Sequence, residues 1–349
     1  MTSMQKFDFK DITLVPEILS SISSRNEISI KNSNNKLPII VSPMDTVIDY
    51  TNHHVFSVMK MEVCLPRNER MDEYDGFTSI SLMEFELMID KYKHFHKEPT
   101  ETKILVDIAN GHMNKLYDLC KYFINEIKTN HQLMVGNIAN PTTYEKYAEL
   151  GVDYIRVGIG GGSGCLTSAN TGIHYPMASL ISECYKIKNM RPFTSKTNIV
   201  ADGGFKKYSD VIKALALGAN YVMLGSILNK CLESTGETTK LNGDKSHEEI
   251  NQYSEYAKEL FNVDTPLFKV FRGMSTKEVQ KSWGKENLTT SEGVVKVQQV
   301  EYTIEGWVNN FESYLKSAMS YTDKKELHQF IGGVKYNHIT MNAFKRFDK

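Results

Sequence analysis

YIRVGIGGGSGCLTSANT, residues 154–171, carries the pattern that decides the fold. A short apolar run at 154–157 leads directly into a glycine-rich loop that holds one cysteine, Cys165. Apolar runs of this length that end in glycine are typical of buried strands. A loop of small residues also exposes backbone N–H groups and a thiol, so it can cradle an anion and present a nucleophile. This stretch therefore predicts a buried strand that ends in a reactive loop.

Short apolar runs of the same kind recur along the chain. Besides 154–157 they occupy 38–41, 63–65, 104–106, 133–135, 199–201, 221–224 and 268–271. Helical patterns separate most of them, for example 141–150, which Asn140 caps and Gly151 ends. Residues 303–319 have the spacing of a last outer helix.

The alternation of strands and helices predicts an α/β protein with a parallel sheet. Eight such units predict a closed (β/α)8 TIM barrel, in which functional residues lie where the strands end. We expect one catalytic domain over residues 1–349, with a mobile flap at about 276–295 after the eighth strand. Polar or glycine-rich segments follow strand after strand: SPMD at 42–45, DIANG at 107–111, GNIAN at 136–140, DGG at 202–204, GS at 225–226 and RGMS at 272–275.

Composition excludes several classes of function. The 41 basic and 42 acidic residues nearly balance, so no strong field attracts nucleic acid or an anionic membrane. Five scattered cysteines without a CxxC pair argue against a disulfide framework and a structural zinc site. No apolar run approaches the roughly 20 residues of a membrane span, and the N-terminus lacks the apolar core of a signal peptide. We expect a cytoplasmic protein with neither nucleic-acid nor membrane partners.

The chain resembles the IMP dehydrogenase and GMP reductase family over nearly its whole length. The matching segments, in order, are FKDITLVP at 9–16, SSR at 23–25, PMDTV at 43–47, VDIANG at 106–111, GNIANP at 136–141, VGIGGGSGC at 157–165, NTGIHYP at 170–176, IVADGG at 199–204, VMLGS at 222–226, FRGMS at 271–275 and SEGVVKV at 291–297. The dehydrogenases usually carry a regulatory insert after the second strand. Residues 66–103 are too few for it, as in the reductases.

The resemblance implies the reductive reaction, in which GMP becomes IMP and ammonia with NADPH as reductant. By position, Cys165 corresponds to the nucleophile that attacks C2 of the purine and forms a thioimidate. Thr167 and Glu292 correspond to the pair that handles the proton on the departing ammonia. The family implies a homotetramer that binds purine nucleotides.

Binding residues follow from the same resemblance. It implies a phosphate cradle, a ribose clamp at Asp202 and base contacts, from Ser163, Asp202, Gly203, Gly204, Gly225, Ser226, Gly273, Met274, Ser275, Ser291 and Gly293. It implies cofactor contacts from Ser24, Arg25, Asp107, Ile108 and Ala109, with Arg25 meeting a phosphate. Potassium would be held by oxygen atoms of Gly160, Gly162, Cys165 and Ser168.

Departures from the family pattern leave other interpretations open. Gly161 replaces the proline usual in the potassium loop, Leu166 and Ser168 replace a threonine and an arginine, and Thr289 replaces a basic residue. The flap sequence KSWGKENLTT at 281–290 has neither the arginine nor the tyrosine with which the dehydrogenases activate water, which favours the reductase reaction over oxidation of IMP to XMP with NAD.

Two further alternatives are a catalytically silent purine-nucleotide-binding protein and a barrel acting on another phosphorylated metabolite. Each candidate residue also has a purely structural interpretation. The thiol of Cys165 would be a small core group, Glu292 and Arg25 solvated surface charges, Asp202 a turn residue and Met274 plain core.

Overall fold

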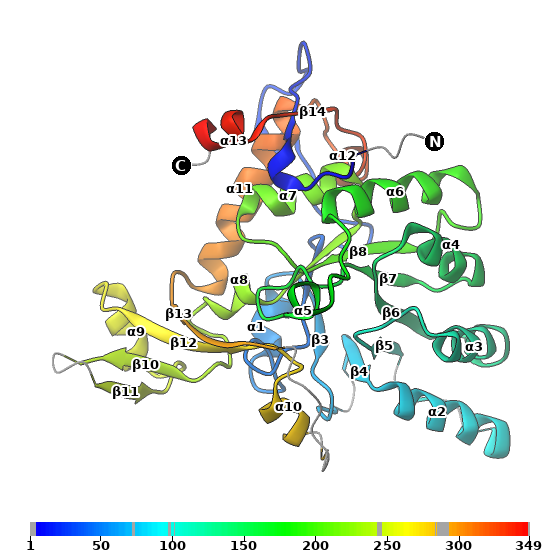
Figure 1. Cartoon of the computed structure of the whole chain (residues 1–349). Coiled ribbons are helices and arrows are strands. Elements are labelled where there is room, and N and C mark those ends of the chain that lie inside the picture. The colour runs from blue at the N-terminus through cyan, green and yellow to red at the C-terminus, as the bar shows by residue number, and fades with distance from the viewer. Residues whose placement is uncertain are drawn as a thin grey trace.

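The computed structural model describes residues 5–71, 74–96, 99–100, 102–242, 246–282, 284 and 293–347. Its centre is a closed barrel of parallel strands in chain order (Figure 1). The barrel strands are β2 (Ile39–Val41), β3 (Glu62–Leu65), β4 (Phe77–Ile80), β5 (Lys103–Asp107), β6 (Gln132–Ile138), β7 (Tyr154–Val157), β8 (Asn198–Asp202) and β9 (Tyr221–Leu224). The barrel closes where β9 pairs with β2. The predicted TIM barrel is confirmed.

Helices surround the barrel. They are α1 (His53–Val58), α2 (Leu82–Phe95), α3 (Asn114–Tyr122) with the π-helical turn η3 (Phe123–Ile127), α4 (Pro141–Leu150), α6 (Met177–Met190), α7 (Tyr208–Leu217) and α11 (Ile304–Tyr321). Two short helices, α5 (Thr167–Thr171) and α8 (Ser226–Asn229), follow β7 and β9. The boundaries of α4 confirm the prediction: the Asn140 side chain accepts a hydrogen bond from Thr142 N–H, and Gly151 ends the helix in the left-handed region.

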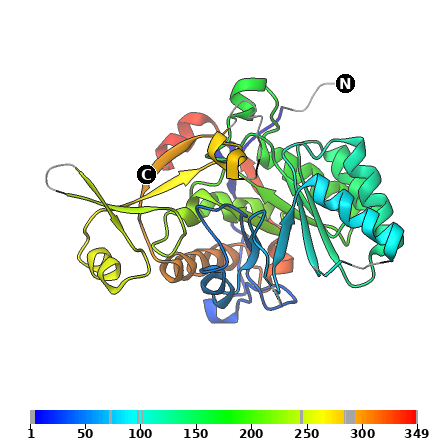
Figure 2. The same cartoon turned by 90° about the horizontal axis from the view of Figure 1, so that it is seen from below.

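One predicted barrel strand is wrong. Residues 268–271 do form a strand, but it belongs to β12 (Leu267–Arg272) in a separate antiparallel sheet of order β11-β10-β12-β13. The other strands of that sheet are β10 (Thr238–Leu241), β11 (His247–Ile250) and β13 (Val295–Gln299), and the helices α9 (Glu255–Asn262) and α10 (Lys277–Ser282) accompany it. Figure 2 shows β10, β11 and α9 projecting to one side of the barrel. The eighth barrel strand is instead β4, which the sequence analysis missed.

The segment predicted as a flap therefore follows β12 and not a barrel strand. Within it, α10 and the start of β13 are described, whereas 283 and 285–292 lie outside the described residues. The single-domain assignment stays a prediction.

The remaining elements join the two ends of the chain. The strand β1 (Ile12–Leu14) pairs antiparallel with β14 (Tyr336–His338) at the top of Figure 1. Near them lie η1 (Phe9–Asp11), η2 (Arg25–Glu27), α12 (Leu327–Phe330) and α13 (Met341–Phe347). In the described part of the chain, no helix combines the length and the apolar character that a bilayer crossing needs.

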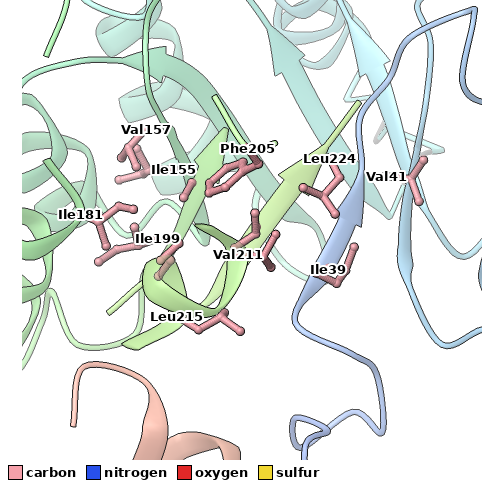
Figure 3. Close-up of a cluster of buried hydrophobic side chains, with 14 of the residues drawn as sticks. Ile39, Val41, Ile155, Val157, Ile181, Ile199, Phe205, Val211, Leu215 and Leu224 are labelled. Atoms are coloured by element: carbon pink, nitrogen blue, oxygen red, sulfur yellow. The ribbon is translucent and has the colours of Figure 1, made fainter. Parts of the chain in front are cut away.

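Strand alternation divides the core into two parts. Successive side chains of a strand point to opposite faces. Ile39, Val41, Ile155 and Val157 thus pack outward against the helices, in the cluster of Figure 3. The intervening residues fill the barrel interior, and every barrel strand contributes to this layer: Ile40, Cys64, Phe77, Leu105, Met134, Tyr154, Val200, Tyr221 and Met223. The next inward positions along the strands form the floor of the site described below.

Candidate functional site

A cavity of about 670 Å³ lies at the barrel mouth. This volume lies in the range of pockets that bind small molecules and cofactors. Most of its lining comes from the ends of barrel strands and from the loops that follow them, because parallel strands all end on one side of a closed barrel. Phe271, residues 273–275 and Gln280 of the additional sheet and its α10 close one wall. The sequence prediction that polar strand ends gather at one mouth is confirmed.

The Cys165 loop presents its thiol to this cavity. Cys165 is half-buried and lines the cavity, and its thiol donates a hydrogen bond to the Thr167 hydroxyl oxygen over 3.3 Å. Its backbone N–H donates to the Gly162 carbonyl over 3.0 Å. Gly160, at φ +77°, allows the tight turn, and its carbonyl accepts a hydrogen bond of 2.9 Å from Ser168. The loop conformation is therefore fixed by its own hydrogen bonds.

The other four cysteines differ from Cys165 in their surroundings. Cys64, Cys120, Cys184 and Cys231 are all buried. Burial raises the pKa of each of these thiols above its ordinary value. Because the thiolate is the nucleophilic form, these four residues are suited to packing rather than to catalysis.

Two segments of the additional sheet attach to the Cys165 loop. The backbone of Gly293 forms an antiparallel bridge with Cys165, and Val294 N–H donates to the Gly164 carbonyl over 3.1 Å. Gly273 N–H in turn donates to the Val294 carbonyl over 3.0 Å. The predicted base-contact residues Gly273, Met274 and Ser275 accordingly line the same cavity as the thiol. Ser291 and Glu292 lie outside the described residues.

The floor of the cavity is an ion cluster. Arg156 donates to the Asp107 carboxylate over 2.7 Å and to Oδ2 of Asp202 over 2.8 Å. Asn137 donates to the same Oδ2 over 2.8 Å, and Arg67 pairs with Asp107 over 3.3 Å. Burial alone would raise the pKa of the Asp107 carboxyl, but Arg156 and Arg67 hold it below its ordinary value. The Asp107 carboxylate is therefore held ionised, and the hydrogen bonds fix both carboxylates in position.

Strand alternation explains why these charges meet. Leu105, Tyr154 and Val200 belong to the interior apolar layer, so the residues two positions further along their strands also point inward. Those residues are Asp107, Arg156 and Asp202. On β6 the equivalent place is Gly136, which pairs with Asp107 in register. A Cβ there would lie 2.7 Å from the Arg156 Cβ, so the glycine leaves room for the arginine.

The residues predicted to cradle a phosphate lie together. Ser163, Gly204, Gly225 and Ser226 all line the cavity, on the loops after β7, β8 and β9, and so does Gly203, which was predicted to bind substrate. The β7 and β8 loops pack closely, since a Cβ on Gly203 would lie 3.0 Å from the Gly162 nitrogen. The cavity therefore has a region lined by glycine backbone and serine hydroxyls, the chemistry that suits a phosphate.

The residues predicted to bind the dinucleotide cofactor fall into two groups. Asp107 and Ala109 line the cavity, and the backbone of Ile108 hydrogen-bonds to the β6 segment beside them. Ser24 and Arg25 are exposed at η2, where neighbouring Glu27 pairs with Lys325, and they do not line this cavity. The cofactor role of all five residues stays a prediction.

The ion cluster around Asp202 was not predicted from the sequence. Arg156 lies inside the otherwise apolar run 154–157, and Asn137 lies within GNIAN at 136–140, so neither residue stands out as a site residue in the sequence. The available signal was a charged residue at an inward position of a buried strand, since such a residue requires a partner.

The cavity lining bears on two kinds of metal site. Among the residues that the structure describes, no group of histidine, cysteine, aspartate and glutamate side chains could hold a metal ion. The predicted potassium ligands are neutral oxygens of a tight loop. The Gly160 carbonyl and the Ser168 hydroxyl lie 2.9 Å apart, which brings two of these oxygens together. Neutral carbonyl and hydroxyl oxygens fit a monovalent alkali cation better than a transition metal.

Comparison with known proteins identifies relatives of the chain. Residues 89–347 match the profile described as the IMP dehydrogenase / GMP reductase domain. The chain is 30% identical over 271 residues to a GMP reductase of Streptococcus pyogenes serotype M5 (strain Manfredo), covering 72% of this chain and 79% of that protein. It is 26% identical to GMP reductase of Streptococcus gordonii, over 94% of both chains. It is 27% identical to GMP reductase 1 of Mus musculus, over 96% of this chain and 95% of the relative.

Proposed function

The chain belongs to the IMP dehydrogenase and GMP reductase family, and on that premise we propose that it reduces GMP to IMP and ammonia with NADPH. The observation that carries the proposal is the thiol of Cys165, half-buried on a glycine-rich loop in the wall of a nucleotide-sized cavity. Similarity to proteins named GMP reductase supports the choice of reaction.

The proposed reaction begins at C2 of the purine. The Cys165 sulfur bonds to this carbon as the C2–N bond to the amino group breaks, which releases ammonia and leaves a thioimidate. NADPH supplies the hydride that C2 then accepts. The C2–S bond breaks, returning the thiolate, so one GMP, one NADPH and one proton give IMP, ammonia and NADP⁺.

Protons are handled next to the sulfur. The Thr167 hydroxyl lies 3.3 Å from Cys165 Sγ, so it is placed to exchange a proton with the thiol or the departing amine. Glu292 is proposed as its partner on the strength of the sequence resemblance alone, as it lies outside the described residues. Without the Thr167 hydroxyl we expect a slower release of ammonia.

The remainder of the nucleotide is held by the rest of the cavity. All hydrogen bonds that the described residues make to the Asp202 side chain go to Oδ2, so Oδ1 keeps its lone pairs for the ribose diol in the proposed complex. Ser163, Gly203, Gly204, Gly225 and Ser226 would bind the phosphate, and Gly273, Met274 and Ser275 the base. Oxygen atoms of Gly160, Gly162, Cys165 and Ser168 would hold a potassium ion, which would stiffen the loop that bears the nucleophile.

A direct assay tests the proposal. Purified protein with GMP and NADPH should consume NADPH and release ammonia in equal amounts, and Cys165→Ser should abolish turnover. Mass spectrometry of the wild type with GMP alone should detect a purine adduct on Cys165, absent from Cys165→Ser.

Other outcomes would assign one of the alternatives. Oxidation of IMP with NAD and no reduction of GMP would identify a dehydrogenase. Tight binding of GMP without turnover under any cofactor would identify a silent nucleotide-binding protein. Turnover that is retained in Cys165→Ser would refute the covalent route. Homotetramer formation, also proposed from the family, is tested by light scattering.

A further inference from the structure

One face of β13 contacts the predicted phosphate cradle. Side chains alternate along this strand, so Val295, Val297 and Gln299 are exposed while Lys296 and Gln298 are half-buried on the opposite face. Lys296 Nζ donates to the Ser163 hydroxyl oxygen over 2.6 Å. Gln298 donates to the Ser226 carbonyl over 3.3 Å. The strand therefore reaches both serines that the sequence assigns to the phosphate.

Lys296 brings a positive charge to this place without a neutralising partner. Within the described part of the chain, no carboxylate lies within ion-pair distance of its ammonium group; its other contact is the ring of Phe271, 5.5 Å away. Burial, followed by repulsion from Lys206 and Lys230, lowers the pKa of Lys296.

Three cations thus gather beside the loops after β7, β8 and β9. Lys206 follows β8, Lys230 follows α8 at the end of β9, and Lys296 lies over Ser163. Lys230 is already paired with Glu301, whereas the ammonium group of Lys296 donates a hydrogen bond directly to the cradle residue Ser163. A dianion bound at Ser163 would offset both the burial and the mutual repulsion of these groups.

We infer that Lys296 is a ligand of the nucleotide 5'-phosphate and gives the site its preference for a monophosphate over the free nucleoside. This inference rests on the proposed function. In the bound form, the Ser163 hydroxyl accepts a hydrogen bond from Lys296 and donates its own proton to a phosphate oxygen. The ammonium group also donates directly to the phosphate, as a lysine point charge commonly does.

Lys296→Met tests the charge, because methionine is unbranched like lysine and keeps the contact with Phe271. Loss of a hydrogen bond between a charged group and the phosphate should weaken GMP binding markedly. We therefore expect the Kd of Lys296→Met for GMP, measured by calorimetry, to rise about 10- to 100-fold. The KM for GMP should rise likewise while kcat changes less than about threefold. Guanosine, assayed as an inhibitor of GMP turnover, should keep its affinity within about twofold. Lys296→Arg should retain most of the binding.

Lys240→Met is the matched control, since Lys240 lies in β10 of the same sheet and pairs with Glu248. It should bind GMP like the wild type. Equal GMP affinity in Lys296→Met and the wild type would overturn this inference alone and leave the reductase proposal standing. Equal losses for GMP and guanosine would also overturn it, because they would indicate a disturbed cavity. A wild type that neither binds nor reduces GMP would overturn both proposals.

Discussion

Replacing Arg156 by methionine should destabilise the protein strongly, because this arginine neutralises two buried carboxylates. It is buried and contacts Asp107 over 2.7 Å and Asp202 over 2.8 Å. Breaking a buried ion pair by removing one partner typically costs about 3–5 kcal/mol. Asp107 keeps Arg67 and Asp202 keeps Asn137, so we expect a loss of about 3 kcal/mol in the free energy of unfolding at pH 7.

Urea unfolding followed by circular dichroism measures this loss, and its pH dependence identifies the cause. In the wild type the pKa of Asp107 is lowered, so its contribution to stability is present above the ordinary value of 3.8 and is lost as the pH falls through the lower folded value. Without Arg156, burial is opposed by Arg67 alone, and the pKa of Asp107 rises. Protonation then removes the uncompensated charge, so the stability difference between variant and wild type should narrow between pH 7 and pH 4.

Two further variants separate charge from packing. Asp202→Asn in the Arg156→Met background removes one of the uncompensated carboxylates and should recover part of the loss, as a double-mutant cycle would reveal. Arg191→Met removes an arginine that pairs with Glu149 at the surface and should cost less than about 1 kcal/mol. A loss below 1 kcal/mol for Arg156→Met, or a loss that is the same at pH 7 and pH 4, would refute the reasoning.

Three other predictions concern single positions. Gly160→Ala should lower the free energy of unfolding by about 1–3 kcal/mol, because Gly160 has φ +77° and a Cβ there would lie 2.5 Å from Ser168. Gly161→Ala should instead raise the free energy of unfolding by about 0.4–1 kcal/mol, because the nearest atom to its Cβ would lie 3.6 Å away. Phe77→Ala should cost about 3–5 kcal/mol in the same urea experiment, since Phe77 is fully buried inside the barrel; a smaller loss would contradict the place of β4 in the barrel. Burial lowers the pKa of Lys269 from 10.5 to about 7, so between these pH values the unfolded chain keeps a proton that the folded protein has lost. The free energy of unfolding of the wild type should therefore rise with pH over this range, and that of Lys269→Met should not. The same dependence of unfolding free energy on pH in both proteins would contradict this prediction.

The sequence predicted the barrel because parallel strands buried on both faces appear as continuous apolar runs. β2 and β7 are buried at every position and were found. β4 is buried equally, but its sequence FTSI contains two hydroxyl residues and so lacks the apolar signal. The segment 268–271 of β12 was predicted as a barrel strand because it is one more short, largely apolar run in the series. Buried and half-buried residues alternate strictly along β12, which is the pattern of an antiparallel strand with one face less covered. This alternation distinguishes β12 from the barrel strands, which are buried on both faces.

The site was predictable where a local motif determines it and not where distant strands meet. The Cys165 loop could be identified because glycine spacing and a following hydroxyl are properties of one stretch of chain. The contacts of Arg156 depend on the register of β5, β7 and β8, which no single segment encodes. Lys296 is similar, because its approach to Ser163 depends on how an antiparallel sheet far along the chain folds back over the barrel mouth.

If the chain binds a nucleotide as proposed, the charge balance of the cavity floor would determine how that nucleotide is oriented. Arg156 and Arg67 neutralise Asp107 and Asp202, so the ion cluster presents almost no net charge to the cavity. The unbalanced positive charge lies at one side, where Lys296 meets Ser163. In the proposed complex a dianionic phosphate would therefore be attracted to that side, which would leave the ribose above Asp202 and direct the base toward the other wall. Since Ser163 and Cys165 belong to one short loop, the same loop that anchors the phosphate sets the distance from the nucleophile to the base, and a change in the loop backbone should alter both binding and turnover.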